Sequence, residues 1–135
     1  MKTTIKRMAV LGFIGYTILL VYWMIWGFGR VPQSDYMYNL IPFNTINHFI
    51  QMDSLSRAQI INLVGNVGVF VPFGILLPLI FDRSLAKSWI IFLCGIFILE
   101  TTQLLTRRGS FDIDDFILNS VGFWLGYGVL KWKNL

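Results

Sequence analysis

The sequence predicts an all-α integral membrane protein, a bundle of four transmembrane helices with a long loop between helices 1 and 2. Hydrophobic residues make up 56% of the 135 residues, and only 13% are charged, about half the share in ordinary soluble domains. The apolar residues fall in four runs, at about 8–28, 59–81, 89–105 and 113–130. Each run has roughly the 17–25 residues that a membrane-spanning helix requires. We expect residues 1–135 to form a single membrane domain.

The first run, 8–28, follows three basic residues, as the apolar core of a signal peptide would. It is longer than the roughly 7–15 residues of such a core, and no small-x-small cleavage site follows it. We therefore interpret it as an uncleaved first helix. The connection 29–58 contains the apolar pentapeptide Asn39-Leu40-Ile41-Pro42-Phe43. This proline-broken segment could lie in the membrane interface or dip back toward the bundle.

The second run, 59–81, contains Pro72 and Pro78. A proline inside a helix removes a backbone hydrogen bond, so we expect a kink there. The third and fourth runs are short for a hydrocarbon core about 30 Å thick, and each reaches that length only by including its polar end. A tight turn around Gly109-Ser110 joins these polar ends. We therefore predict a helical hairpin with a polar tip at one membrane face.

The basic residues predict the orientation of this bundle. Cytoplasmic segments of membrane proteins carry an excess of Lys and Arg. With four crossings, seven of the 11 basic residues lie on the side of the termini and four on the other. The seven are Lys2, Lys6, Arg7, Arg83, Lys87, Lys131 and Lys133, and the four are Arg30, Arg57, Arg107 and Arg108. We expect a multi-pass cell-membrane protein with N- and C-termini cytoplasmic and the polar tip outside.

The composition also limits the classes of partner and cofactor. In a membrane protein, a net charge of +4 indicates orientation and contact with anionic lipid, so we expect no nucleic acid partner. Cys94 is the only cysteine and His48 the only histidine. One chain therefore forms neither an intramolecular disulfide nor a zinc site of His and Cys ligands. We expect no cofactor and no bound metal.

Polar side chains gather at one end of the predicted bundle. On the third helix they recur at i, i+3 and i+7, and the fourth helix repeats that spacing, so each set shares one helix face. The second helix adds two asparagines one turn apart. A carboxylate in hydrocarbon costs roughly 2.5–3.5 kcal/mol unless it is paired or solvated. The three sets are Glu100, Gln103 and Arg107; Asp112, Asp115 and Asn119; and Asn62 and Asn66.

Two interpretations of this cluster stay open. The polar groups could have a purely structural role, joining the helices by hydrogen bonds, with Arg107 or Arg108 neutralising Glu100 or Asp112. Alternatively, they line a cavity, open to the outer surface, that binds a lipid head group or a carbohydrate. We favour the cavity, because packing alone rarely requires several carboxylates. The candidate ligand-binding residues are Asn66, Glu100, Gln103, Arg107, Arg108, Asp112, Asp115 and Asn119.

The carboxylates of this cluster also suggest two kinds of chemistry. Asp112, Asp114 and Asp115 could hold one Mg²⁺ or Ca²⁺ ion, but only if the helix begins after Asp114, because Asp114 is otherwise rotated off the shared face. Glu100 with Asp115 could act as an acid/base pair, so enzymatic activity is left open.

Small residues continue the polar face of the fourth helix. Gly122 and Gly126 follow Asp115 and Asn119 at helical spacing. A G-x-x-x-G pattern permits the close approach of another helix. We therefore expect this face to be buried against another span.

Several of these residues form an ordered set of short motifs. The set runs Asn39-Leu-Ile-Pro-Phe43, Gly65-Asn66-x-x-x-Phe70-x-Pro72-x-Gly74, Glu100-x-x-Gln103, Arg107 or Arg108, and Asp112-x-Asp114-Asp115-x-x-x-Asn119-x-x-Gly122. In this order it resembles the VanZ-like family over roughly residues 38–130. The resemblance implies a small bacterial multi-pass membrane protein. The founding member of the family is linked to low-level teicoplanin resistance.

The resemblance implies a cell-envelope protein that supports resistance to lipoglycopeptides such as teicoplanin. The polar site in the outer leaflet would engage the antibiotic, its lipid anchor or a lipid-linked cell-wall precursor, and membrane lipids are the other expected partners. Two alternatives stay open. One is an intramembrane hydrolase or transferase acting on a lipid head group, and the other is a purely structural membrane scaffold.

Overall fold

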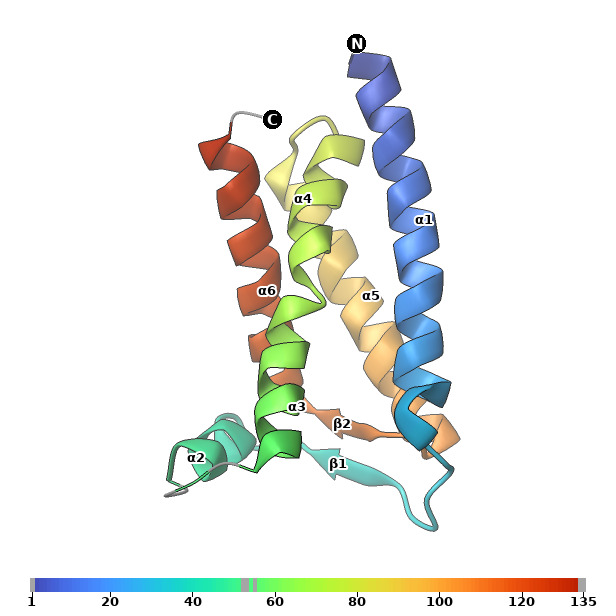
Figure 1. The fold of residues 1–135 in the computed structure, drawn as a ribbon, viewed down its shortest axis with the longest axis vertical. Helices are drawn as coiled ribbons and strands as arrows, with labels where there is room; N and C mark the ends of the chain where they lie inside the picture. The colour runs from blue at the N-terminus through green and yellow to red at the C-terminus, as the bar shows by residue number, and fades with distance from the viewer. Residues whose placement is uncertain (1, 52–53, 55, 134–135) are drawn as a thin grey trace.

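The computed structural model describes residues 2–51, 54 and 56–133, and its long helices form an elongated bundle (Figure 1). Helices α1 (Lys2–Trp26), α5 (Leu85–Thr106) and α6 (Ile113–Trp132) are continuous, whereas α3 (Arg57–Gly68) and α4 (Val71–Ile80) follow each other along one column. Short elements close one end, and both termini lie at the other. The short elements are η1 (Gly27–Gly29), β1 (Met37–Asn39), α2 (Asn44–Gln51) and β2 (Ser110–Asp112).

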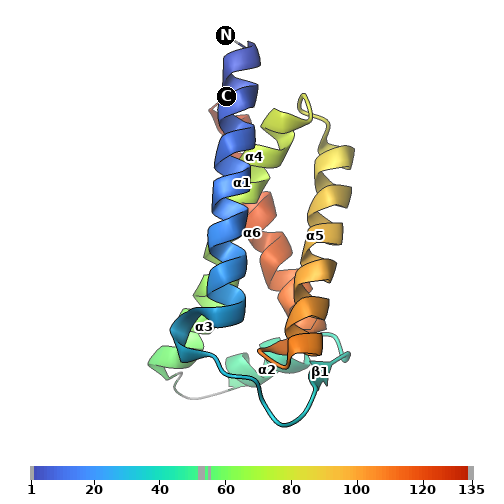
Figure 2. The ribbon, with the colours of Figure 1, turned by 90° about the vertical axis from the view of Figure 1, so that its right-hand side faces the viewer.

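Three helical segments among the described residues are long and apolar enough to cross a membrane. They are Lys2–Trp26, Gln59–Ile80 and Leu85–Thr106, so the first three predicted runs are confirmed as candidate spans. Together they indicate a multi-pass membrane protein. Helix α6 lies beside α4 but has two aspartates in its first turn, and the fourth span is not confirmed. In the turned view of Figure 2, α1 and α5 flank α4 and α6.

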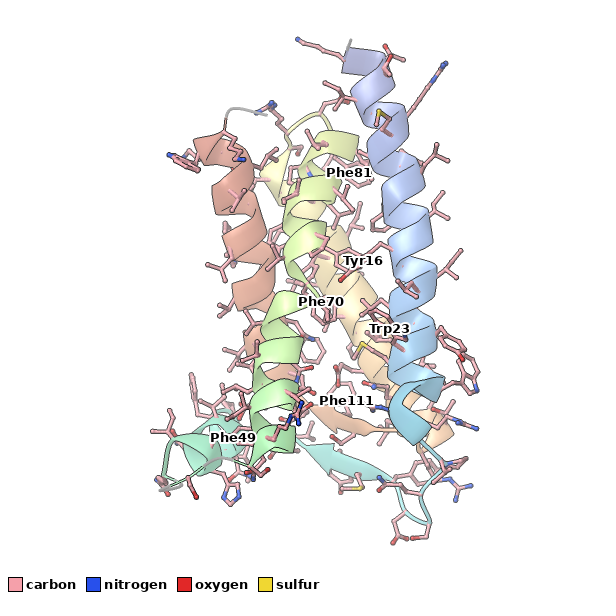
Figure 3. All side chains as sticks on the ribbon, in the orientation of Figure 1. Tyr16, Trp23, Phe49, Phe70, Phe81 and Phe111 are labelled. Carbon is pink, nitrogen blue, oxygen red and sulfur yellow. The ribbon has the colours of Figure 1, made fainter. Side chains whose placement is uncertain are left out.

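The predicted kink is a break between two helices. Helix α3 ends before Val69, and α4 follows Phe70. Pro72 lies in the first turn of α4, where a missing N–H is tolerated, and Pro78 lies inside α4. Tyr16 of α1 points toward this break, and its hydroxyl donates to the Val69 carbonyl oxygen at 2.8 Å (Figure 3). The break thus frees a carbonyl that a neighbouring helix satisfies.

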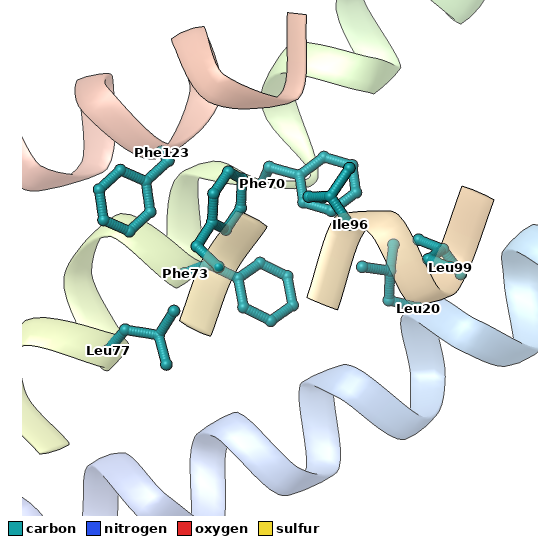
Figure 4. Close-up of a cluster of buried hydrophobic side chains, with 8 residues drawn as sticks. Leu20, Phe70, Phe73, Leu77, Ile96, Leu99 and Phe123 are labelled. Carbon is teal, nitrogen blue, oxygen red and sulfur yellow. The ribbon is translucent and has the colours of Figure 1, made fainter. Parts of the chain in front are cut away.

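Aromatic side chains fill the middle of the bundle (Figure 4). The rings of Phe92 and Phe123 lie 4.7 Å apart between centroids, and Phe70 meets Phe92 edge-on at 6.0 Å. Leu20 and Leu77 close the cluster from α1 and α4. This core holds together α1, α4, α5 and α6, at mid-height between the termini and the closed end.

Glycines allow α6 to approach α3 and α4 closely. A Cβ atom at Gly122 would overlap the Val67 carbonyl oxygen, and one at Gly126 would overlap that of Val71. Gly74 of α4 meets the backbone of α6 as closely. The prediction that this face of α6 is buried is confirmed. A short connection joins the third and fourth runs, as the predicted hairpin requires. The backbone of α6 lies closest to α3 and α4, and α6 meets α5 through the rings of Phe123 and Phe92.

Candidate functional site

A two-stranded parallel sheet closes the end of the bundle opposite the termini. Strand β1 pairs with β2, with Asn39 opposite Asp112. The connection after α5 is therefore more than the predicted tight turn. Its first residue, Arg107, has a left-handed backbone with φ 55°, and a strand follows from Ser110. The sheet brings the loop between α1 and α3 against the start of α6.

Asp114 is fully buried and organises this loop. Its carboxylate accepts hydrogen bonds from the backbone N–H groups of Phe43 at 2.6 Å and Ile46 at 3.0 Å. These donors lie at the start of α2, where a carboxylate satisfies unpaired N–H groups and complements the helix dipole. This contact ties the end of the segment 39–43 to the bundle, while Leu40, Ile41 and Phe43 are exposed, so its two predicted arrangements both stay open. Asp114 was absent from the predicted site.

Asp112 is the N-cap of α6 and the second anchor of the loop. Its carboxylate accepts hydrogen bonds from the Asn39 amide at 3.0 Å and from the Thr45 hydroxyl at 2.6 Å. Because α6 begins at Ile113, Asp112 and Asp114 serve separate loop partners rather than one ion. In the described part of the chain, no three His, Cys, Asp or Glu side chains are grouped so as to hold a metal.

A polar cavity of about 250 Å³ lies between these anchors and the ends of α1, α3 and α5 opposite the chain termini. Four predicted residues line it, namely Asn66, Gln103, Asp112 and Asp115. The same wall includes Arg30, Thr45 and Asn62. The structure therefore brings together half of the predicted set, contributed by three helices as the spacing indicated. Their role in binding a ligand stays a prediction.

Asp115 joins α6 to α3 across this cavity. One carboxylate oxygen accepts a hydrogen bond from the Asn66 amide at 2.8 Å. Its other oxygen has no hydrogen-bond partner among residues 2–51, 54 and 56–133. Gln103 is held from the side of α1, because its amide donates to the Met24 carbonyl oxygen at 3.2 Å. The cavity wall thus contains a carboxylate with one hydrogen-bonded oxygen and one oxygen available to a ligand.

Two predicted residues are fully buried and do not line the cavity. Glu100 accepts a hydrogen bond from the Asp112 N–H at 3.4 Å, while its Oε1 has no partner within the described chain. Asn119 is 0% exposed, and neither atom of its amide has a partner in the part of the chain described.

Arg107 and Arg108 do not line the cavity. Helix α5 ends at Thr106, so the left-handed Arg107 leaves the helix face that the spacing assigned to it. Arg107 donates to the Ser34 carbonyl oxygen at 3.1 Å, and Arg108 to that of Arg30 at 3.2 Å. Neither has a carboxylate within 4 Å among the described residues. The purely structural interpretation allowed one of them to neutralise Glu100 or Asp112, and no such ion pair is formed among the described residues.

Among the described residues of the cavity wall, the cationic side chain is that of Arg30, which is outside the predicted set of ligand-binding residues. It follows η1 and is half-buried, and its guanidinium donates to the Arg108 carbonyl oxygen at 3.1 Å. No carboxylate of the described chain lies within 4 Å of it. The sequence signal that could have identified Arg30 is its position shortly after the first apolar run, on the same side of the membrane as the predicted polar tip.

A family profile with the description VanZ/LLP1 matches residues 13–134. The match includes all the helices except the first turns of α1, and every residue of the cavity wall. No curated protein and no solved structure matches the chain.

Proposed function

The chain belongs to the VanZ/LLP1 family, and from this membership we propose that it supports resistance to lipoglycopeptides such as teicoplanin in the bacterial cell envelope. It does so through the polar cavity, which engages the antibiotic or a lipid-linked cell-wall precursor in the outer leaflet. In this proposal α6 is a fourth crossing and both termini are cytoplasmic. The common end of the two termini and the seven basic residues there support that orientation.

The observation that best supports a binding role is that two charged side chains of the cavity wall lack full partners. Asp115 keeps one oxygen free of hydrogen bonds, and Arg30 has no carboxylate within 4 Å, both within the described residues. Charged groups at membrane depth are costly unless they are solvated or paired. A polar ligand that carries donors and an anionic group would satisfy both. Asp112 and Asp114 are already used by the loop, so they support the fold around the cavity.

One observation favours the enzyme alternative, an intramembrane hydrolase or transferase acting on a lipid head group. Glu100 is fully buried behind Asp112 of the cavity wall, and its Oε1 has no partner among the described residues; a carboxyl group placed in this way is a candidate for general acid/base catalysis. The scaffold alternative accounts for Asp112 and Asp114, whose carboxylates only hold the loop. It does not account for the cavity beside them.

Resistance measured with one isosteric variant tests the proposal. We expect Asp115→Asn, which keeps the shape but removes the charge, to lower teicoplanin resistance in a susceptible host at an unchanged level of membrane protein. Asp82→Asn is the matched control, because Asp82 is exposed at the opposite end and pairs with Lys6 at 2.8 Å. Full resistance in Asp115→Asn would refute the role of the cavity.

A further inference from the structure

An apolar groove adjoins the polar cavity on the side of α1 and α3. It has a volume of about 410 Å³ and is walled by Leu20, Trp23, Ile61, Gly65 and Val69. Four residues belong to both walls, namely Met24, Arg30, Asn62 and Asn66. Groove and cavity therefore adjoin at these four residues; the groove is mostly apolar, and the cavity is polar.

Arg30 lies at the junction of the two parts. Its guanidinium is held by the Arg108 carbonyl oxygen at 3.1 Å, and none of the described carboxylates lies within 4 Å of it. Beyond Arg30, the polar part offers acceptors, above all the half-used carboxylate of Asp115 beside Asn66. From the groove inward, the wall is thus apolar, then cationic, then rich in acceptors.

We propose that this composite site binds a phosphate-bearing amphiphile, with its tail between α1 and α3, its phosphate on Arg30 and its hydroxyl or amine groups at Asp115. Arginine presents planar donors that match phosphate oxygens, and a charge at this position favours an anion. The order of groups is that of a lipid whose phosphate joins the tail to a polar head, rather than that of an acylated glycopeptide. The proposal rests on the proposed function and selects one of its two ligand classes.

Trp23 in the groove wall provides a local reporter of the tail. Bromine atoms on an acyl chain quench tryptophan fluorescence on contact. The full chain in detergent is titrated with phosphatidylethanolamine carrying brominated acyl chains, and Trp23→Phe identifies the part of the quenching that comes from the groove. We expect that part to saturate. Brominated diacylglycerol, which has the same tails without phosphate, should not saturate it, and inorganic phosphate should not displace the phospholipid.

Arg30→Gln tests the phosphate contact. We expect the affinity for the brominated phospholipid to fall about tenfold, as for a lost hydrogen bond to a charged group. Arg57→Gln should bind like the unmodified chain, because Arg57 lies at the same end of the bundle and lines neither part of the site. If Arg30→Gln lowers the melting temperature, Arg30→Lys replaces it. We expect Arg30→Lys to bind more weakly than the unmodified chain, since it keeps the charge but loses the planar donors.

Three results would overturn the assignment: equal saturation by diacylglycerol, displacement by inorganic phosphate, or undiminished affinity in a folded Arg30 variant. The outcome is separable from that of the resistance test. Loss of resistance in Asp115→Asn with unchanged lipid binding in Arg30→Gln would refute the phosphate-bearing ligand and leave the proposed function standing. Arg30-dependent lipid binding, together with full resistance in Asp115→Asn, would refute the proposed function and leave the phosphate-bearing ligand standing.

Discussion

Adjacent aspartates at the start of α6 have different roles, because one residue turns a side chain by about 100° around a helix. Asp114 faces the loop and caps α2 through the N–H groups of Phe43 and Ile46. Asp115 faces α3 and the polar cavity, where Asn66 binds one of its oxygens. The first is a structural anchor, and the second is the candidate for ligand recognition.

Removing the Asp114 carboxylate should loosen the loop, although the Asp114 side chain itself does not line the cavity. We expect Asp114→Ala to cost about 2 kcal/mol of local stability, because two buried N–H groups lose a charged acceptor. Amide hydrogen exchange in residues 43–51 should speed up by more than tenfold. Asp35→Ala, in an exposed part of the same loop, is the control. Equal exchange in the two variants would mean that Asp114 does not hold α2.

At the scale of elements, the seam between α6 and the α3–α4 column determines the packing. Its glycines bring backbones together, and the aromatic core follows on the side of α5 and α1. Shape complementarity of this kind replaces the hydrophobic driving force that lipid does not supply. The polar cavity lies at the end of the same seam that is opposite the chain termini, so errors in the packing of α6 would displace Asp115 as well.

The seam predicts opposite results for two glycines of α6. Gly126→Leu should lower the melting temperature in detergent, since overpacking of a close contact costs about 1–3 kcal/mol. Gly128→Leu should change it little, because a Cβ atom at Gly128 has no atom within 4 Å. Equal melting temperatures for the two variants would show that the α6 face is open to lipid.

At the scale of the whole molecule, the candidate binding residues lie at one end of the bundle. The sheet, α2 and the polar cavity lie opposite both termini. The orientation in the membrane therefore decides whether a ligand arrives from outside the cell or from the cytoplasm. The excess of basic residues near the termini predicts an external site.

Labelling of intact cells tests this orientation. In a Cys94→Ser background, Ser34→Cys should react with an impermeant maleimide on intact cells, because Ser34 is exposed in the loop before β1. Lys133→Cys, at the end of the termini, should react only after lysis. The reverse pattern would place the polar cavity in the cytoplasm and exclude an extracellular antibiotic as its direct ligand.

Binding by the whole molecule should not depend on divalent metal. The carboxylates of Asp112, Asp114 and Asp115 each bind a different partner, and Mg²⁺ or Ca²⁺ requires several oxygen ligands at one point. We expect EDTA to leave the affinity for the brominated phospholipid in nanodiscs unchanged. Loss with EDTA and recovery with Mg²⁺ would contradict a metal-free site and favour the enzyme alternative.

The sequence by itself determined three candidate spans, the helical faces of Gln103 and Asp115, and the glycine seam of α6. These features depend on local hydrophobicity and on the 3.6-residue period, which act between residues close in the chain. They sufficed to predict a polar cavity built from three helices.

Only the tertiary structure decided how the closed end is assembled. Strands of three residues, 37–39 and 110–112, pair across more than 70 positions, and no local pattern indicates such a pairing. That pairing gives Asp114 its loop partners. The left-handed turn at Arg107 removes the two predicted arginines from the cavity and leaves Arg30 as its cation. A helical face can be read from spacing, but the partner of a charge depends on where distant segments meet.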